Sequence, residues 1–184
     1  MKDINYVRAV AKQCIEDLNA IGIYPNITPN DVTINNRLQR VWGRCWTHWE
    51  NNSRTKWHFT IEVSSKLLGD DVPDKSLRSN LFHEMCHSCD ECVNVHHGGK
   101  WKEYAELIND CYNMNIQRCT SSAEYNVEDN RKAYGWKCSA CGKKFVKMGY
   151  KAPKWYIHPK GYTHKNCPCG KGYVMSEYYG YKLV

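Results

Sequence analysis

The chain has 184 residues, a hydrophobic content of 42% and a formal net charge of +7. This length suits one domain with a small additional one, and the apolar content excludes wholesale disorder. No apolar run reaches the ~18 residues that a membrane-spanning helix needs, and the first five residues do not resemble a signal peptide. We therefore expect a cytoplasmic protein with no membrane partner. In that reducing compartment the eleven cysteines are expected to be metal ligands and free thiols.

The charge is divided unevenly along the chain. Residues 131–184 hold 12 Lys and Arg against one acid, whereas residues 1–130 hold 14 Lys and Arg against 18 Asp and Glu. Between these parts, residues 120–126 lack apolar periodicity. We therefore predict two domains, residues 1–125 and residues 126–184, of which the second is strongly basic.

The first part of the chain predicts a helix followed by a small sheet. Apolar residues recur at the 3.6-residue period over residues 3–20. Three strands are expected next: one over residues 32–38, a tryptophan-rich one over residues 40–50, and an alternating one over residues 57–63. The Asn-rich turn at residues 51–53 favours an antiparallel hairpin between the last two, with the tryptophans packed on the sheet.

The next predicted helix, residues 75–89, carries the most informative pattern. It contains His83-Glu84-Met85-Cys86-His87, the His-Glu-x-x-His pattern of zinc metallopeptidases. On a helix, the two histidines lie four residues apart on one face and can hold one Zn²⁺. Glu84 is then close enough to act on a water that zinc activates. The competing interpretation is an ordinary helix with two exposed histidines.

A catalytic zinc site takes three protein ligands and keeps one open position. One common arrangement places a third histidine six residues after the second, but that residue is Val93. Glu103 and Glu106 are available on the following helical pattern, although acids on an amphipathic helix usually face solvent. We favour His97, with its neighbour His96 as the alternative, because two glycines follow and let the backbone turn tightly beside a metal.

Together these features resemble the SprT-like (Spartan) metalloprotease family, in which a helix, a small sheet and His-Glu-x-x-His precede a pattern seen here as His97-Gly98-Gly99-Lys100-Trp101. The resemblance covers roughly residues 3–175. It implies an α+β fold of zincin-like type, with helices packed on a short antiparallel-type sheet, followed by a zinc ribbon. It implies zinc ligation by His83, His87 and His97, catalysis by Glu84, and protein substrates bound or crosslinked to DNA.

The segment after the histidine motif departs from the family pattern, since it contains Cys86, Cys89 and Cys92. These side chains are inert thiols, which we favour, or a second metal site, or the source of a thiolate that caps the zinc. The sequence identifies no firm donor to the transition-state oxyanion. Tyr104 or a backbone amide at the edge of the sheet would serve.

The basic domain contains the pattern of a zinc ribbon. Cys138-Ser139-Ala140-Cys141-Gly142 is a zinc knuckle, and Cys167-Pro168-Cys169-Gly170 is its partner pair. The second pair has one intervening residue instead of two, so either Cys167, which we favour, or His164 completes the ligand set. A structural zinc would stabilise this core-poor segment, and the chain would then bind two zinc ions.

Lysines in the basic domain alternate with aromatic residues such as Trp155 and Tyr162. Lysines engage phosphates and aromatic rings stack on unpaired bases, whereas guanine reading favours Arg. We therefore predict sequence-independent DNA binding that extends to single strands. The predicted function is a zinc-dependent endopeptidase acting on DNA-associated proteins. The alternative is a non-catalytic zinc-containing DNA-binding module, which would not need Glu84.

Overall fold

The computed structural model describes residues 2–38 and 40–127 throughout. Further along the chain it describes residues 132–137, 141–142, 144–149, 163–164, 169, 173–174 and 180–181. Contacts divide the chain into two compact units, Met1–Glu128 and Asp129–Val184, and each is described by itself. Among the described residues, no helix combines the length and apolarity needed to cross a membrane.

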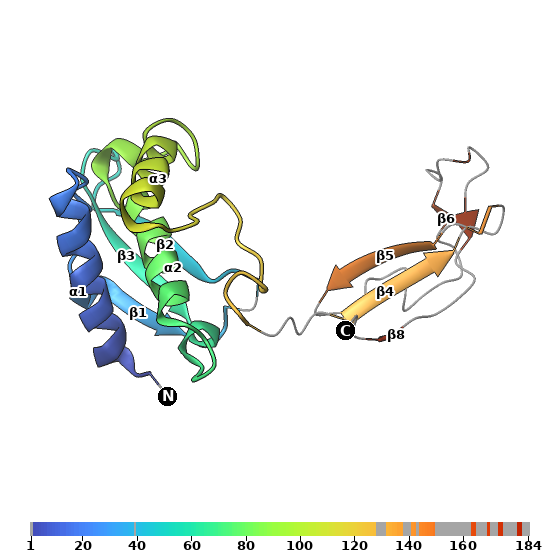
Figure 1. The fold of residues 1–184 in the computed structure, drawn as a ribbon. Coiled ribbons are helices and arrows are strands. Elements are labelled where there is room, and N and C mark those ends of the chain that lie inside the picture. Colours follow the sequence, from blue (N-terminus) through green and yellow to red (C-terminus); the bar gives the residue numbers. More distant parts are fainter. Residues whose placement is uncertain are drawn as a thin grey trace. The chain divides into compact units, whose positions relative to one another are not determined.

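The first unit is an α+β fold with a helical layer on a three-stranded sheet (Figure 1). Helices α1 and α2 pack against the same sheet, and α2 also contacts α3. The elements are α1 (Ile4–Ala20), β1 (Val32–Asn35), β2 (Gly43–Trp49), β3 (Trp57–Ser64), α2 (Asp74–His87) and α3 (Gly99–Tyr112). Short 3₁₀ turns η1 (Pro29–Asp31), η2 (Ser65–Leu68) and η3 (Asp90–Cys92) lie in the connections.

The sheet is mixed, with the strand order β1-β3-β2. The expected hairpin of β2 and β3 is present, but β1 runs parallel to β3, so the prediction of an antiparallel-type sheet was wrong for this strand. The reason lies in β3, whose Phe59, Ile61 and Val63 are all buried. The most apolar strand takes the central position, where it pairs along both edges, and this leaves β2 as an edge strand. Because β2 runs opposite to both β1 and β3, the pairing of β1 with β3 is parallel.

Helix α1 forms as its apolar period predicts, with Asp3 as its N-cap; the Asp3 carboxylate accepts a hydrogen bond from the Tyr6 N–H at 2.9 Å. Helix α2 is buried on several sides rather than along one stripe. Leu81, Phe82 and Glu84 point in different directions around the helix axis, and all three are buried. The helix that carries the predicted site residues is therefore held between α1, α3 and the sheet.

In the second unit most of the described residues lie in short strands. Strand β4 (Lys132–Lys137) pairs antiparallel with β5 (Lys144–Gly149) and with β8 (Gly180–Tyr181), and β6 (Thr163–His164) pairs with β7 (Tyr173–Val174). Cys141 lies in the turn between β4 and β5. Cys138 and Cys167 lie outside the described residues, so the zinc ribbon site stays a prediction.

Candidate active site

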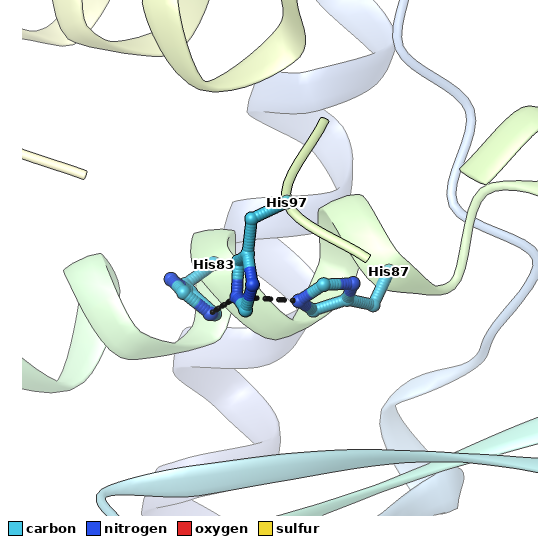
Figure 2. Close-up of side chains that lie close together, drawn as sticks. All are labelled: His83, His87 and His97. Carbon is cyan, nitrogen blue, oxygen red and sulfur yellow. Dashed lines mark hydrogen bonds between the residues drawn. The ribbon is translucent and has the colours of Figure 1, made fainter. Parts of the chain in front are cut away.

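Three histidines converge in the first unit (Figure 2). The Nε2 atom of His97 lies 3.1 Å from Nε2 of His83 and 3.2 Å from Nε2 of His87. Tetrahedral zinc with bonds of ~2.0–2.1 Å to nitrogen would separate its ligand atoms by about 3.3 Å, so this spacing fits the metal. Among the described residues, this is the one group of three or more metal-ligand side chains that lie together.

The three histidines come from two parts of the chain, helix α2 and the connection before α3. His83 and His87 are one helical turn apart on α2, and their rings lie 5.3 Å apart between centroids. His97 comes from the connection to α3, where Asn94 (φ 66°) and His96 (φ 50°) adopt the left-handed conformation. This turn directs His97 into the group and leaves His96 exposed and outside it.

Trp101 on α3 holds the three imidazoles from one side. Its side chain is buried, and its ring centroid lies 4.6 Å from that of His97 and 4.9 Å from that of His83. The ring stacks on His87 at 5.4 Å. A rigid aromatic wall limits the rotamers of all three histidines, and such preorganisation suits a group that could hold a metal ion.

The histidines are neutral in this environment. Burial lowers the pKa of His83 to about 4 and that of His87 to about 3, and the neighbouring imidazoles act in the same direction. The pKa of His97 is also lowered, first by burial and then by the charge of Arg118. His83 also hydrogen-bonds to the backbone of Gln117, which orients its ring and leaves Nε2 facing the group. Neutral imidazoles are the form that binds a metal.

Glu84 is the buried acid of the site, with 6% of its surface exposed. Burial raises its pKa to about 8, while a hydrogen bond to the backbone of Cys45 and the positive charge of Arg44 act in the opposite direction. A carboxyl group with this pKa can accept a proton and release it near neutral pH, as a general acid–base group must.

The free edge of β2 explains how the backbone of Cys45 reaches Glu84. The Trp42 carbonyl accepts a hydrogen bond from the Ser64 N–H, and the Glu50 N–H donates to the Lys56 carbonyl. In this antiparallel register the even-numbered residues of β2 bond to β3. The odd-numbered residues therefore direct their N–H and C=O groups away from β3, and the backbone of Cys45 bonds to Glu84 on α2.

Helix α2 approaches β2 very closely at Gly43. A Cβ atom at this position would lie 2.9 Å from Cγ of Glu84 and would also collide with the Asn80 amide. Only glycine permits this contact, so Gly43 sets how near Glu84 lies to the strand.

A cavity of about 490 Å³ lies over the histidines and Glu84. Its walls come from β2 and the connection before it, α2, the connection before α3, and the segment of residues 116–127 that follows α3. In that segment, Tyr125 is buried and packs edge-on against Trp42 at 5.7 Å, and the Trp42 indole N–H donates to the Thr120 carbonyl at 3.0 Å. The Tyr125 hydroxyl hydrogen-bonds to side chains on α2 one turn before the histidine motif, Ser79 and Asn80.

Sequence reasoning missed the contribution of this segment. Residues 120–126 lack apolar periodicity, so they indicated a domain boundary rather than a cavity wall. Tyr125, an aromatic residue in a polar run, was the only signal available. By contrast, Tyr104, one of two suggested oxyanion donors, does not line the cavity and so is not placed to contact a substrate there.

The cysteines after the motif are buried thiols. Cys86 and Cys89 have no exposed surface, and Cys92 is 3% exposed. Burial raises the pKa of all three, that of Cys92 to about 11, which keeps them protonated near neutral pH. Within the described part of the chain they form no group of metal ligands. This environment supports their interpretation as inert thiols.

The fold and the site together define a metalloprotease-like domain, in which one helix carries two converging histidines and a buried glutamate. The model of the SprT-like family matches residues 11–120, which is more than half of the chain. The chain therefore belongs to the SprT-like family. No curated protein matched it. The matched range runs from α1 to Thr120 and ends before the basic domain.

Proposed function

We propose that this chain is a zinc-dependent endopeptidase that acts on DNA-associated proteins and binds DNA through its basic C-terminal domain, in the cytoplasm. The observation that carries the proposal is the buried carboxyl of Glu84 next to three neutral, converging imidazoles at an open cavity. A purely structural zinc site has no use for an open cavity or for a buried acid beside it, which disfavours the non-catalytic alternative.

Each side chain of the site has a role in peptide hydrolysis. His83, His87 and His97 would hold the zinc. When bound, zinc polarises a scissile carbonyl and lowers the pKa of water to about 7. Glu84 would accept the proton of the attacking water and pass it to the leaving amine, while the backbone of Cys45 keeps the carboxylate in place.

The free edge of β2 supports a polypeptide substrate. Gly43, Cys45 and Thr47 line the cavity, and their outward-facing backbone groups lie along an edge that no other described strand covers. An extended peptide could add to such an edge as a further strand, with its scissile bond over the histidines. A backbone amide of this edge remains a candidate oxyanion donor, as the sequence suggested.

The DNA-binding part of the proposal rests on composition. Residues 131–184 hold 12 basic residues against one acid, and aromatic residues are interspersed among them. A zinc held by Cys138, Cys141, Cys167 and Cys169 would organise this segment. Lysine-rich, aromatic surfaces bind nucleic acid without reading its sequence.

The test is cleavage of a DNA-binding protein, with and without DNA, by wild type, Glu84→Gln and Glu103→Gln. Glu84→Gln should keep its zinc but lose at least the ~10²–10⁴-fold attributed to general acid–base catalysis. Glu103 is exposed on α3 and pairs with Lys100, so its variant should keep full activity. Equal cleavage by all three proteins would show that Glu84 is not the base. A zinc-loaded wild type that binds DNA and cleaves nothing would favour the non-catalytic module.

A further inference from the structure

The charged residues that line the cavity are almost all of one sign. Arg40, Arg44 and Arg118 contribute to its walls, and Glu84 is the only acid among the described residues that line it. Glu84 is buried and already engaged with the backbone of Cys45. A substrate that enters the cavity therefore meets cationic side chains and no accessible carboxylate.

Two of the arginines have no partner within the described residues. Arg40 and Arg118 are exposed, and neither forms an ion pair or a hydrogen bond with any described residue. Arg44 differs, because its guanidinium lies 5.0 Å from the ring of Trp46. Guanidinium groups bind carboxylates and phosphates through paired N–H donors, so Arg40 and Arg118 are available for an anionic ligand.

The charge of Arg118 also acts on the three-histidine group. This positive charge is the main electrostatic influence on His97 after burial. Arg118 belongs to the 116–127 segment, whereas Arg40 lies in the connection before β2. Two separate segments therefore place cations at one cavity, and neither cation has an ion-pair partner among the described residues.

We propose that Arg40 and Arg118 form an anion subsite that selects polypeptide substrates with Asp or Glu beside the scissile bond. The inference rests on the proposed peptidase function and narrows its substrate class. A substrate carboxylate would be attracted to either guanidinium. A substrate lysine at the same place would be repelled, with no accessible acid nearby to compensate.

The shape of the site favours a peptide over nucleic acid as the anionic ligand. The cavity of about 490 Å³ is in the size range of pockets that enclose small ligands. The same cavity is bordered by the free edge of β2, which offers peptide-pairing groups at Gly43 and Thr47. Trp42, an aromatic residue of the wall, packs on Tyr125 and donates its indole N–H to Thr120 rather than presenting an open stacking surface.

The test uses three peptides with one neutral core and Glu, Gln or Lys on both sides of it. Binding is measured by fluorescence anisotropy on zinc-loaded Glu84→Gln protein, and hydrolysis on wild type. The affinity should fall from Glu to Gln to Lys. The ratio of Glu to Lys should be about tenfold at low salt and should shrink as salt rises, because exposed charges are screened.

Arg118→Glu should abolish or reverse the order of affinities for the Glu, Gln and Lys peptides. Arg40→Glu, made independently, should do the same. Arg54→Glu is the matched control, since it changes the net charge equally but lies in the turn between β2 and β3, where its guanidinium is 5.8 Å from the ring of Trp49. The Arg54→Glu variant should still bind the Glu peptide most tightly and the Lys peptide least tightly. Zinc content reports whether each variant is folded at the site.

The outcomes separate this inference from the proposed function. Charge-ordered binding without any hydrolysis by wild type would support the subsite and refute the peptidase. Hydrolysis of all three peptides at equal rates, with equal affinities, would overturn the subsite and leave the peptidase intact. A short single-stranded oligonucleotide that displaces the Glu peptide, and that loses as much affinity as the peptide does in Arg118→Glu, would overturn the proposal in favour of phosphate binding.

Discussion

At the scale of single residues, burial of the Glu84 carboxyl group has a cost to stability. Its pKa is about 8 in the folded protein against an ordinary value of 4.5, and burial is the main cause. The folded state therefore holds the proton more strongly than the unfolded state does. Stability contributed by this group is present below pH 4.5 and is lost as pH rises through 8.

We therefore expect Glu84→Gln to stabilise the metal-free protein, because Gln carries no charge to bury. The gain in unfolding free energy should be small at pH 5 and should reach a few kcal/mol above pH 8, at about 1.4 kcal/mol per pKa unit. Urea unfolding of chelator-treated protein at both pH values measures it, with exposed Glu103→Gln as the control. An equal gain at both pH values would contradict the raised pKa.

His97 and His96 give a second comparison at this scale. His97→Ala removes one of three converging nitrogens and should lower the zinc content by about one ion per chain, because two histidines do not complete a catalytic site. His96→Ala alters an exposed neighbour outside the group and should leave the content unchanged. Elemental analysis after brief chelator treatment distinguishes them. Equal zinc contents would remove His97 from the ligand set.

At the scale of elements, the contact between α2 and β2 determines where Glu84 lies. Gly43→Ala inserts a methyl group against Glu84 and Asn80, which should cost roughly 1–3 kcal/mol and lower peptide hydrolysis as α2 shifts. Gly69→Ala is the control, because its Cβ would meet Val72 at an ordinary 3.5 Å. Denaturant unfolding and kcat/KM report the two effects. An active, fully stable Gly43→Ala protein would mean that the close approach is not required.

At the scale of the whole molecule, the site and the basic charge lie in different parts of the chain. All cavity-lining residues and the family match fall within Met1–Glu128. A chain ending at Glu128 should keep the active-site zinc but lose DNA binding and any stimulation of cleavage by DNA. In the full chain, DNA affinity should fall steeply as salt rises, because each neutralised phosphate releases a counterion.

Binding of a labelled oligonucleotide by the full and shortened chains at several salt concentrations is the measurement. If the shortened chain bound DNA with undiminished affinity at moderate salt, the nucleic-acid surface would lie on the first unit. Arg37, Arg40, Arg44 and Arg54 would then be its natural candidates, and the anion subsite would need to be reconsidered with them.

The sequence by itself determined the features that depend on local spacing. The fixed rise and turn of a helix bring residues four apart onto one face, so the spacing of His83 and His87 alone is enough to pair them. The apolar period of α1 and the hairpin of β2 and β3 are equally local. The family resemblance rested on the same local patterns.

Tertiary structure decided the features that join distant segments. Whether His97, His96 or a glutamate of α3 completes the histidine group depends on a turn with left-handed residues and on the packing of Trp101. The parallel pairing of β1, the closeness of Gly43 to Glu84, and the placement of Arg118 and Tyr125 at the cavity likewise leave no periodic trace in the sequence. These features depend on how all the elements pack together into one core. The free energy gained by burying apolar surface is a property of that combined arrangement and not of any single segment.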